Sequence, residues 1–206
     1  MMIAIVDYGV GNIFSLYSSF GYIGAEAVLT GDADKIRAAD KIILPGVGAF
    51  GDAVEKLRDS GLAQVVVEAA KAGKPCLGIC LGMQLLFEKG YEYGEHDGLG
   101  LIKGDVVTME GVVPADFKVP HIGWNALQFP KGKEKSPLFK YIEEGDFVYF
   151  VHTYYAANCE DAVIATTEYG AELTAAVARD NVYGVQFHPE KSGETGMKIL
   201  KGFIEL

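Results

Sequence analysis

The sequence predicts an α/β fold, with a central, mainly parallel sheet that is flanked by helices and extended by antiparallel strands in its C-terminal half. Two observations predict it. In roughly the first ninety residues, short and continuously apolar runs alternate with helical patterns, which is typical of β-α-β units whose strands are covered on both faces. From about residue 99 the chain becomes strand-rich, and several runs alternate apolar with polar residues, as antiparallel strands do. No repeat or linker divides the chain, so we expect one domain over residues 1–206.

The predicted elements follow in order along the chain. Buried strands are expected over residues 2–9, 25–30, 41–45 and 74–80. Helices are expected over residues 12–20, 53–73 and 81–90, the second of them broken near Gly61. Antiparallel strands are expected within residues 98–110, 121–129, 146–158, 161–170 and 173–190, and a closing helix over 194–206. The segment "FPKGKEKSP" (129–137) is predicted to be a surface loop.

Composition and charge exclude several classes of function. The formal net charge of −10 disfavours a nucleic-acid backbone or an anionic membrane as partner, because both require a basic face. No run approaches eighteen uninterrupted apolar residues, and the N-terminus lacks the pattern of a signal peptide. The sequence has three cysteines but no export signal, and their spacing is not that of metal ligands. We therefore expect no disulfides and no zinc site. We therefore expect a cytoplasmic protein with no metal and no cofactor.

The strongest local signal is "GICLG" (78–82), between an apolar run and a helical pattern. It has the form of a nucleophile elbow, with Cys80 in the place of serine. A sharp strand-to-helix turn strains the middle residue and lifts its side chain above the sheet, and glycines at positions 78 and 82 relieve crowding. The start of the following helix favours thiolate. The alternative is that Cys80 is a buried core residue, which is how we interpret Cys76, while Cys159 is interpreted as an incidental thiol.

A thiol nucleophile needs a base, and His188 is the best placed of four histidines. It ends the apolar run "VYGVQF", Pro189 stops that run, and Glu190 is placed to turn back and orient the imidazole. These residues predict a Cys80–His188–Glu190 triad. Of the other three histidines, His96 is expected to be exposed to solvent, and neither His121 nor His152 is followed by a carboxylate at short range.

The segments "GICLGMQ" and "QFHPEKS" together resemble the class I (triad) glutamine amidotransferases, in motif order and in their separation of 108 residues. This family hydrolyses the side-chain amide of L-glutamine to glutamate and ammonia. Three further segments, "DYGVGNIFS", "PGVGAFGDA" and "VPHIGWN", are similar to the branch that serves as the glutaminase subunit of imidazole glycerol phosphate synthase in histidine biosynthesis. The likeness covers nearly the whole chain. It implies a heterodimer with a cyclase subunit of (β/α)8 barrel fold, to which ammonia is channelled.

The resemblance also implies roles for individual residues. It makes "PGVG" an oxyanion strand. The residues themselves disfavour dinucleotide binding by "GVGAFG" (46–51), because the segment follows a later strand, Pro45 precedes it and no acidic ribose ligand is placed in a following strand. Backbone donors to the oxyanion are implied at Val47, Gly48 and Leu81. Glutamine-binding positions are implied at Gln84, Glu92, Thr153 and Tyr154. Contacts with the cyclase are implied at Asn12 and Trp124.

The residues leave several alternatives open. Without the family, Gln84 and Glu92 fit an ordinary solvated helix face, and Trp124 fits the core. A thiol hydrolase or peptidase of similar fold would also use a cysteine elbow. A glutaminase subunit of a different synthase, or a catalytically silent binding subunit, would keep the fold and change the role. The intact triad and "VPHIGWN" argue against the last two.

Overall fold

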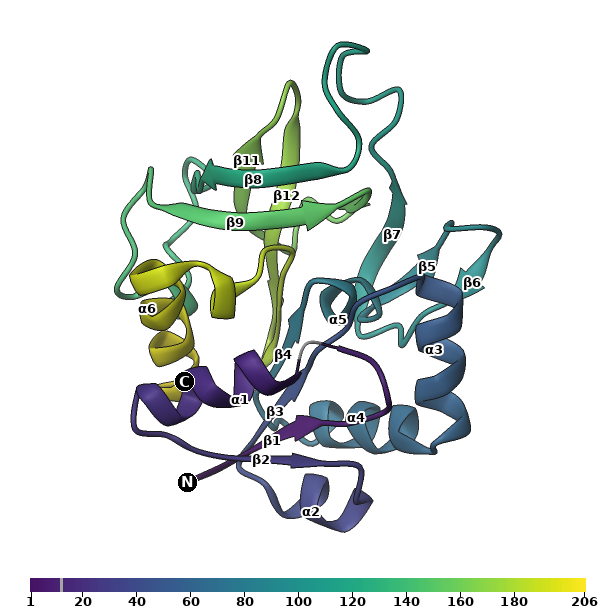
Figure 1. Cartoon of the computed structure of the whole chain (residues 1–206), viewed down its shortest axis with the longest axis vertical. Coiled ribbons are helices and arrows are strands. Elements are labelled where there is room, and N and C mark those ends of the chain that lie inside the picture. The colour runs from purple at the N-terminus through teal and green to yellow at the C-terminus, as the bar shows by residue number, and fades with distance from the viewer. Residues whose placement is uncertain (12) are drawn as a thin grey trace.

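The computed structural model describes residues 1–11 and 13–206, and a seven-stranded sheet forms its centre (Figure 1). The strand order is β11-β12-β13-β4-β3-β1-β2. These strands are β1 (Met2–Val6), β2 (Glu26–Thr30), β3 (Lys41–Leu44), β4 (Cys76–Ile79), β11 (Val163–Glu168), β12 (Glu172–Arg179) and β13 (Val182–Val185). The five strands from β13 to β2 run parallel, and β12 and β11 continue the sheet antiparallel. The predicted α/β class is confirmed.

Helices cover both faces of this sheet, which explains why its inner parallel strands are mostly apolar and buried. The helices are α1 (Ile13–Tyr22), α2 (Ala33–Ala38), α3 (Phe50–Asp59), α4 (Leu62–Lys71) and α6 (Gly193–Ile204). In β1, Ala4 and Val6 pack into the core cluster that contains residues of α2, α3 and α4, while Ile3 and Ile5 pack into the cluster with α1 and α6. Alternate residues of one strand thus reach opposite layers.

The predicted helix break is confirmed, but one helix was missed. The break near Gly61 separates α3 from α4, and Gly61 has a φ of +74°, in the left-handed region. Helix α2 was not predicted, because its six residues contain only one buried side chain, Ile36, and show no helical periodicity. Among the helices of the described residues, none is long and apolar enough to cross a membrane.

The predicted helix over residues 81–90 is wrong beyond its first turn. Helix α5 (Leu81–Gln84) is followed by strand β5 (Phe87–Gly90). The run Leu85, Leu86 and Phe87 is fully buried where the central sheet meets a second sheet, so its apolar character does not report a helical face. That four-stranded sheet has the order β10-β7-β5-β6, with β6 (His96–Asp97), β7 (Ile102–Thr108) and β10 (Tyr154–Ala157).

Only some of the predicted antiparallel strands extend the central sheet. Strands β8 (His121–Ala126) and β9 (Phe147–His152) pair with each other, and in Figure 1 they run crosswise to β11 and β12. The predicted strand over 146–158 is divided at Thr153, so that β9 and β10 belong to different sheets. Residues 129–137 form a loop as predicted, which runs into the short 3-10 helix η1 (Pro137–Phe139). A second 3-10 helix, η2 (Pro189–Lys191), precedes α6.

Candidate active site

Cys80 lies at a sharp turn between β4 and α5. Its backbone has φ 54° and ψ −114°, a conformation that non-glycine residues rarely adopt. Its N–H donates to the carbonyl of Val185 in the adjacent β13, at 2.8 Å. A Cβ at position 78 would lie 2.6 Å from the Gly82 carbonyl oxygen, and one at position 82 would overlap the Leu44 carbonyl oxygen. Close backbone approach therefore requires both glycines of "GICLG".

His188 and Glu190 reach the same edge of the sheet as Cys80, because β13 is the parallel neighbour of β4. The N–H of His188 donates to Tyr149 O at 2.9 Å. The imidazole Nδ1 is 2.8 Å from Glu190 Oε1, and both side chains are 4% exposed. A carboxylate only accepts, so Nδ1 carries a hydrogen and Nε2 is left for the hydrogen bond with Cys80. Sulfur, imidazole and carboxyl group thus meet in one buried cluster.

The surroundings of His188 favour its protonated form. Burial by itself lowers the pKa of this imidazole, but hydrogen bonds with Cys80 and Glu190 and the negative charges of both partners outweigh burial and raise the pKa to about 9. Near neutral pH His188 is therefore an imidazolium, placed between the Cys80 sulfur and the Glu190 carboxyl group. A protonated imidazole beside a sulfur nucleophile can act as the acid in a reaction that the sulfur begins.

The free energy of unfolding is expected to fall as the pH rises from about 6.5 to about 9. An unfolded histidine titrates near 6.5, so the raised folded-state pKa contributes stability below about pH 6.5 that is lost on passing pH 9, by up to about 3 kcal/mol. Urea unfolding of wild type and His188→Asn at pH 6 and 9.5 measures the effect. The wild type should lose about 3 kcal/mol more than the variant. Equal losses in both proteins would contradict the assignment.

A cavity of about 330 Å³ opens above Cys80 and His188. It is lined by Val47, Gly48, Cys80, Leu81, Gln84, Glu92, Pro120, Val151, His152, Thr153, Tyr154, His188 and Lys191. The structure thus brings nearly all of the sequence-predicted catalytic, oxyanion and glutamine-binding positions to one cavity. Glu190 is absent from the lining because it lies behind His188. Of the two predicted partner contacts, Trp124 lies outside the cavity, and Asn12 lies outside the described residues.

The segment after β3 forms one wall of this cavity. Gly48 has a φ of +99° with open space around its Cα, and Val47 is 42% exposed. Gly46 lies against the elbow, because a Cβ there would be 2.9 Å from Gly82 N. Val47, Gly48 and Leu81, the first residue of α5, thus line the same cavity. An oxyanion site needs backbone N–H donors from residues in such a position.

Gln84 and Glu92 also line the cavity, and neither lies on a solvated helix face. Gln84 is 5% exposed, and its Nε2 donates to Tyr154 O at 3.1 Å. Glu92 follows β5, and its Oε2 accepts from the Phe50 N–H at the start of α3, at 2.7 Å. The alternative of an ordinary helix face is therefore wrong for both residues. Trp124 is 51% exposed, so the alternative of a core tryptophan is wrong as well.

Sequence reasoning missed Gln186, although it lies within the quoted "QFHPEKS". This side chain is fully buried, and its Oε1 accepts from Gln84 Nε2 at 3.0 Å. Its Nε2 then faces the Cys80 sulfur at 3.8 Å. A row of amide hydrogen bonds thus connects the cavity wall to the nucleophile. Its position directly after β13, two residues before His188, was the available signal.

Sequence reasoning also set aside His121 and His152, which form a buried pair. The Nδ1 of His152 donates to Tyr154 O at 2.9 Å, and its Nε2 is 3.0 Å from His121 Nδ1. Burial lowers the pKa of His152 to about 3, so this imidazole is neutral and its Nε2 accepts from His121. The Tyr154 carbonyl therefore receives two donors, from His152 and Gln84. The pair holds the corner between β9 and β10 in place.

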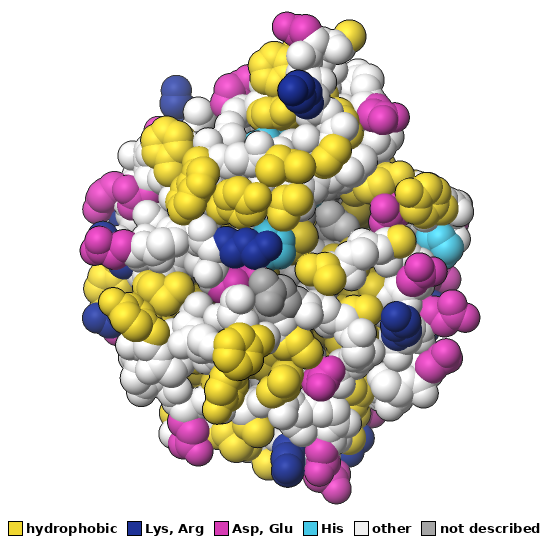
Figure 2. Space-filling model, in the orientation of Figure 1, with side chains coloured by type: hydrophobic (Ala, Val, Ile, Leu, Met, Phe, Trp, Pro, Cys, Tyr) yellow, Lys and Arg dark blue, Asp and Glu magenta, His cyan; other side chains and the backbone are white. Residues whose placement is uncertain are grey.

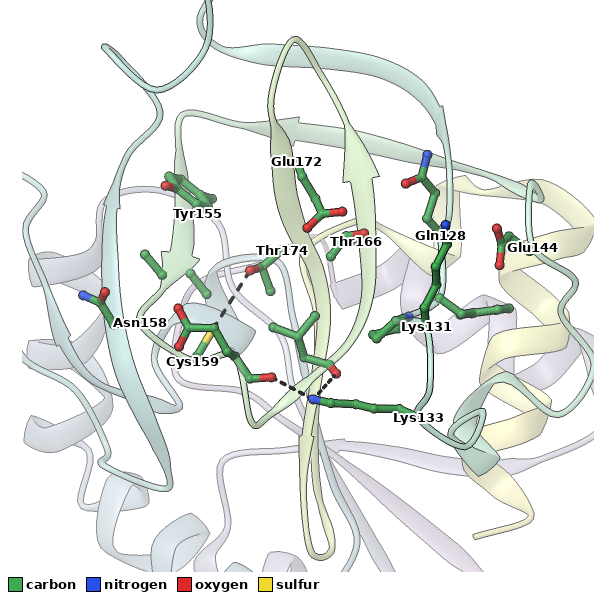
Figure 3. Close-up of a pocket in the computed structure, with 16 residues that line it drawn as sticks. Gln128, Lys131, Lys133, Glu144, Tyr155, Asn158, Cys159, Thr166, Glu172 and Thr174 are labelled. Carbon is green, nitrogen blue, oxygen red and sulfur yellow. Dashed lines mark hydrogen bonds between the residues drawn. The ribbon is translucent and has the colours of Figure 1, made fainter.

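A second cavity, of about 840 Å³, lies between the loop 129–137 and strands β10, β11 and β12 (Figure 3). Lys133 Nζ donates there to the Glu160 carbonyl at 2.8 Å, which ties the loop to the sheet. Cys159 contacts Thr174 Oγ1 at 4.0 Å, and burial raises the pKa of its thiol to about 11. A thiol of this kind is unreactive. None of the sequence-predicted site residues lines this cavity.

Comparisons with known proteins agree with this geometry. Residues 4–206 match the family described as glutamine amidotransferase class-I. The chain is 50% identical over 206 residues to "Imidazole glycerol phosphate synthase subunit HisH" of Caldanaerobacter subterraneus subsp. tengcongensis, covering 100% of this chain and 98% of that protein. It is 52% identical to the subunit of the same name from Sulfurimonas denitrificans, covering 99% and 98%. Among solved structures, PurLQS from Thermotoga maritima is similar at a TM-score of 0.76, with 24% identity and coverage of 99% and 97%.

Proposed function

The chain belongs to the class I glutamine amidotransferase family, and from this premise we propose that it is the glutaminase subunit of imidazole glycerol phosphate synthase. In this role it releases ammonia from L-glutamine for a cyclase subunit, which makes imidazole glycerol phosphate and an aminoimidazole carboxamide ribonucleotide in histidine biosynthesis. The observation that carries the proposal is the sequence identity of 50% and 52% to relatives of that name, over nearly the full length of each protein. We further propose that residues 1–206 form a single domain. We propose that the protein acts in the cytoplasm.

In the first half of the reaction, Cys80 forms a thioester. The thiolate attacks the side-chain carbonyl carbon of glutamine, and the carbonyl electron pair moves to oxygen. Backbone N–H groups of the segment at Val47 and Gly48, and of Leu81, stabilise this oxyanion. The tetrahedral intermediate then collapses, the C–N bond breaks, and the His188 imidazolium gives its proton to the departing nitrogen as ammonia forms. The raised pKa of His188 suits this acid step.

In the second half, water hydrolyses the thioester. The neutral imidazole of His188 takes a proton from water, whose oxygen attacks the acyl carbon. The C–S bond breaks, glutamate leaves, and the thiolate and imidazolium are restored. Glu190 stabilises the charged imidazole through Nδ1 in both halves.

We assign glutamine recognition to cavity residues outside the triad and the oxyanion segment. We propose that the Glu92 carboxylate binds the α-ammonium group, since it offers a negative charge at the cavity. Backbone groups at Thr153 and Tyr154, on the corner between β9 and β10, are proposed to bind the α-carboxylate. Gln84 supports that corner through Tyr154 O.

An exposed apolar surface on the face shown in Figure 2 is evidence that the chain binds a partner protein. Hydrophobic side chains gather there over β8 and β9 and again over α1. They are Ile122 and Trp124 on β8, Phe147 on β9, and Phe14 and Tyr17 on α1, between 46% and 78% exposed. Clustered apolar side chains of this size mark interaction sites. We propose that the cyclase, as a (β/α)8 barrel, covers this surface, and that Asn12 and Trp124 contribute to the contact.

Mixing the chain with the cyclase subunit and its ribonucleotide ligand is expected to raise the rate of glutamate formation strongly. Trp124→Ala should weaken the complex about 30-fold or more, because exposed tryptophans are frequent anchors of interfaces. Glutamate formation is measured against cyclase concentration. Leu29→Ala, on the distant edge strand β2, serves as control and should leave the half-saturating concentration unchanged.

Other outcomes of the same assay identify the rival functions. Stimulation by a different synthase and not by this cyclase would assign the chain to another glutamine-dependent enzyme. Hydrolysis of peptide substrates in preference to glutamine would favour a thiol peptidase. Binding without any glutamate formation would indicate a silent subunit.

A further inference from the structure

Tyr8 is buried at the end of β1 and is hydrogen-bonded to the residue that begins the oxyanion strand. It is 6% exposed, and its hydroxyl donates to Pro45 O at 2.8 Å. Strands β1 and β3 are parallel neighbours, so the residues that follow them meet at the same edge of the sheet. Tyr8 follows β1 by two residues and Pro45 follows β3 directly. The topology therefore brings them together across 37 residues of chain.

The Tyr8 hydroxyl and the elbow both lie close to Gly46. A Cβ at Gly46 would lie 2.9 Å from Tyr8 Oη, 2.9 Å from Gly82 N and 3.0 Å from the Leu81 Cβ. Nothing comparable surrounds Gly48, where a Cβ would meet no atom within 4 Å. The base of the strand is thus clamped, and the residues that carry the proposed oxyanion donors extend from it.

The chemistry of the hydrogen bond admits one direction only. The Pro45 carbonyl can only accept, so the Tyr8 hydroxyl must be the donor. Burial raises the pKa of Tyr8 well above the ordinary value of a phenol, and the charge of Cys80 raises it further. The hydroxyl thus keeps its proton at every pH at which the enzyme works.

We propose that Tyr8 is a positioning residue for the oxyanion strand. Its hydroxyl anchors the Pro45 carbonyl and so sets the direction from which the N–H groups at Val47 and Gly48 approach the negative oxygen of the intermediate. Tyr8 does not line the cavity, so it does not contact glutamine. The inference rests on the proposed glutaminase function and adds to it a residue outside the triad and the cavity wall.

Tyr8→Phe tests the proposal, because it removes the hydroxyl and keeps the ring. The variant and wild type are assayed with the cyclase and its ligand. We expect kcat for glutamine hydrolysis to fall about tenfold, as loss of one hydrogen bond at a sensitive site would cause, with KM for glutamine unchanged within about twofold. Tyr141→Phe is the matched control. It loses a tyrosine hydrogen bond to Glu205, far from the site, and should match wild type.

Alkylation of Cys80 by iodoacetamide separates positioning of the strand from general loosening. Alkylation forms no oxyanion, so the second-order rate should be the same in Tyr8→Phe and wild type. If alkylation slows in parallel with turnover, or if kcat of Tyr8→Phe equals that of Tyr141→Phe, the proposal is wrong. An active wild type with an unaffected Tyr8→Phe overturns this inference alone. An inactive wild type overturns the proposed function, and the inference falls with it.

Discussion

Cys80→Ser is expected to lower kcat for cyclase-stimulated glutamine hydrolysis by about 10⁴-fold or more, with glutamine still bound. Serine fits the strained turn, because it has nearly the same shape as cysteine and leaves Gly78 and Gly82 in place. It does not form an anion beside the His188 imidazole, so the pair that attacks the amide is lost. The cavity walls at Glu92 and Tyr154 remain. Steady-state glutamate formation and glutamine binding by calorimetry measure the two effects.

Cys76→Ser is the matched control for this substitution. Cys76 stands four residues earlier, on β4, with its thiol donating to Lys74 O, a bond that a serine hydroxyl also makes. Burial raises the pKa of the Cys76 thiol to about 12, so it takes no part in catalysis. This variant should keep the wild-type rate within about twofold. A Cys80→Ser enzyme that retained the stimulated rate would show that another group is the nucleophile.

Gly82→Ala is expected to destabilise the protein by about 3 kcal/mol or more. The added methyl group would overlap the carbonyl oxygen of Leu44 and approach the Pro45 carbonyl carbon at 3.1 Å. Both are backbone atoms at the end of β3, between neighbours in the sheet, so neither can move without displacing the oxyanion strand. Urea unfolding measures the loss. Residual folded protein should also show a lower kcat, because Gly46 packs directly on this turn.

Gly21→Ala makes the same chemical change where space is open. Gly21 lies in α1, and a Cβ there would meet no atom within 4 Å. We expect this variant to be more stable than wild type by about 0.5–1 kcal/mol, since alanine favours a helix over glycine. If Gly82→Ala were to lie within 0.5 kcal/mol of wild type, the close approach of the elbow to β3 would be refuted.

Residues close together in the chain carried most of the fold prediction. The apolar runs at β1, β3 and β4 are short, continuous and bounded by turn residues, so they were recognisable without any neighbour. The same applies to α3 and α4, whose break at Gly61 depends on local conformation. The prediction over 81–90 failed for the converse reason. Leu85 to Phe87 are apolar because two sheets meet around them, a cause that no local period records.

The residues of the site also fall into two groups, those recognisable from local sequence and those that depend on contacts between distant segments. The spacing of "GICLG" and of "HPE" identified Cys80, His188 and Glu190, because the elbow and the turn back from histidine to carboxylate are local geometries. Gln186 and Tyr8 escaped notice. Their significance lies in a 3.8 Å contact with the Cys80 sulfur and a 2.8 Å bond to Pro45 O, between segments 106 and 37 residues apart.

The sequence by itself determined the α/β class and most of its strands, and it pointed to Cys80, His188 and Glu190 as the proposed nucleophile, base and orienting carboxylate. Only the tertiary structure decided which strands became neighbours, that Gln84 and Glu92 face a cavity and not solvent, and which buried donors hold the Tyr154 and Pro45 carbonyls. The physical reason is that backbone conformation and apolar periodicity depend on adjacent residues. Hydrogen-bond partners and close contacts depend on where the packed sheet places residues far apart in the chain.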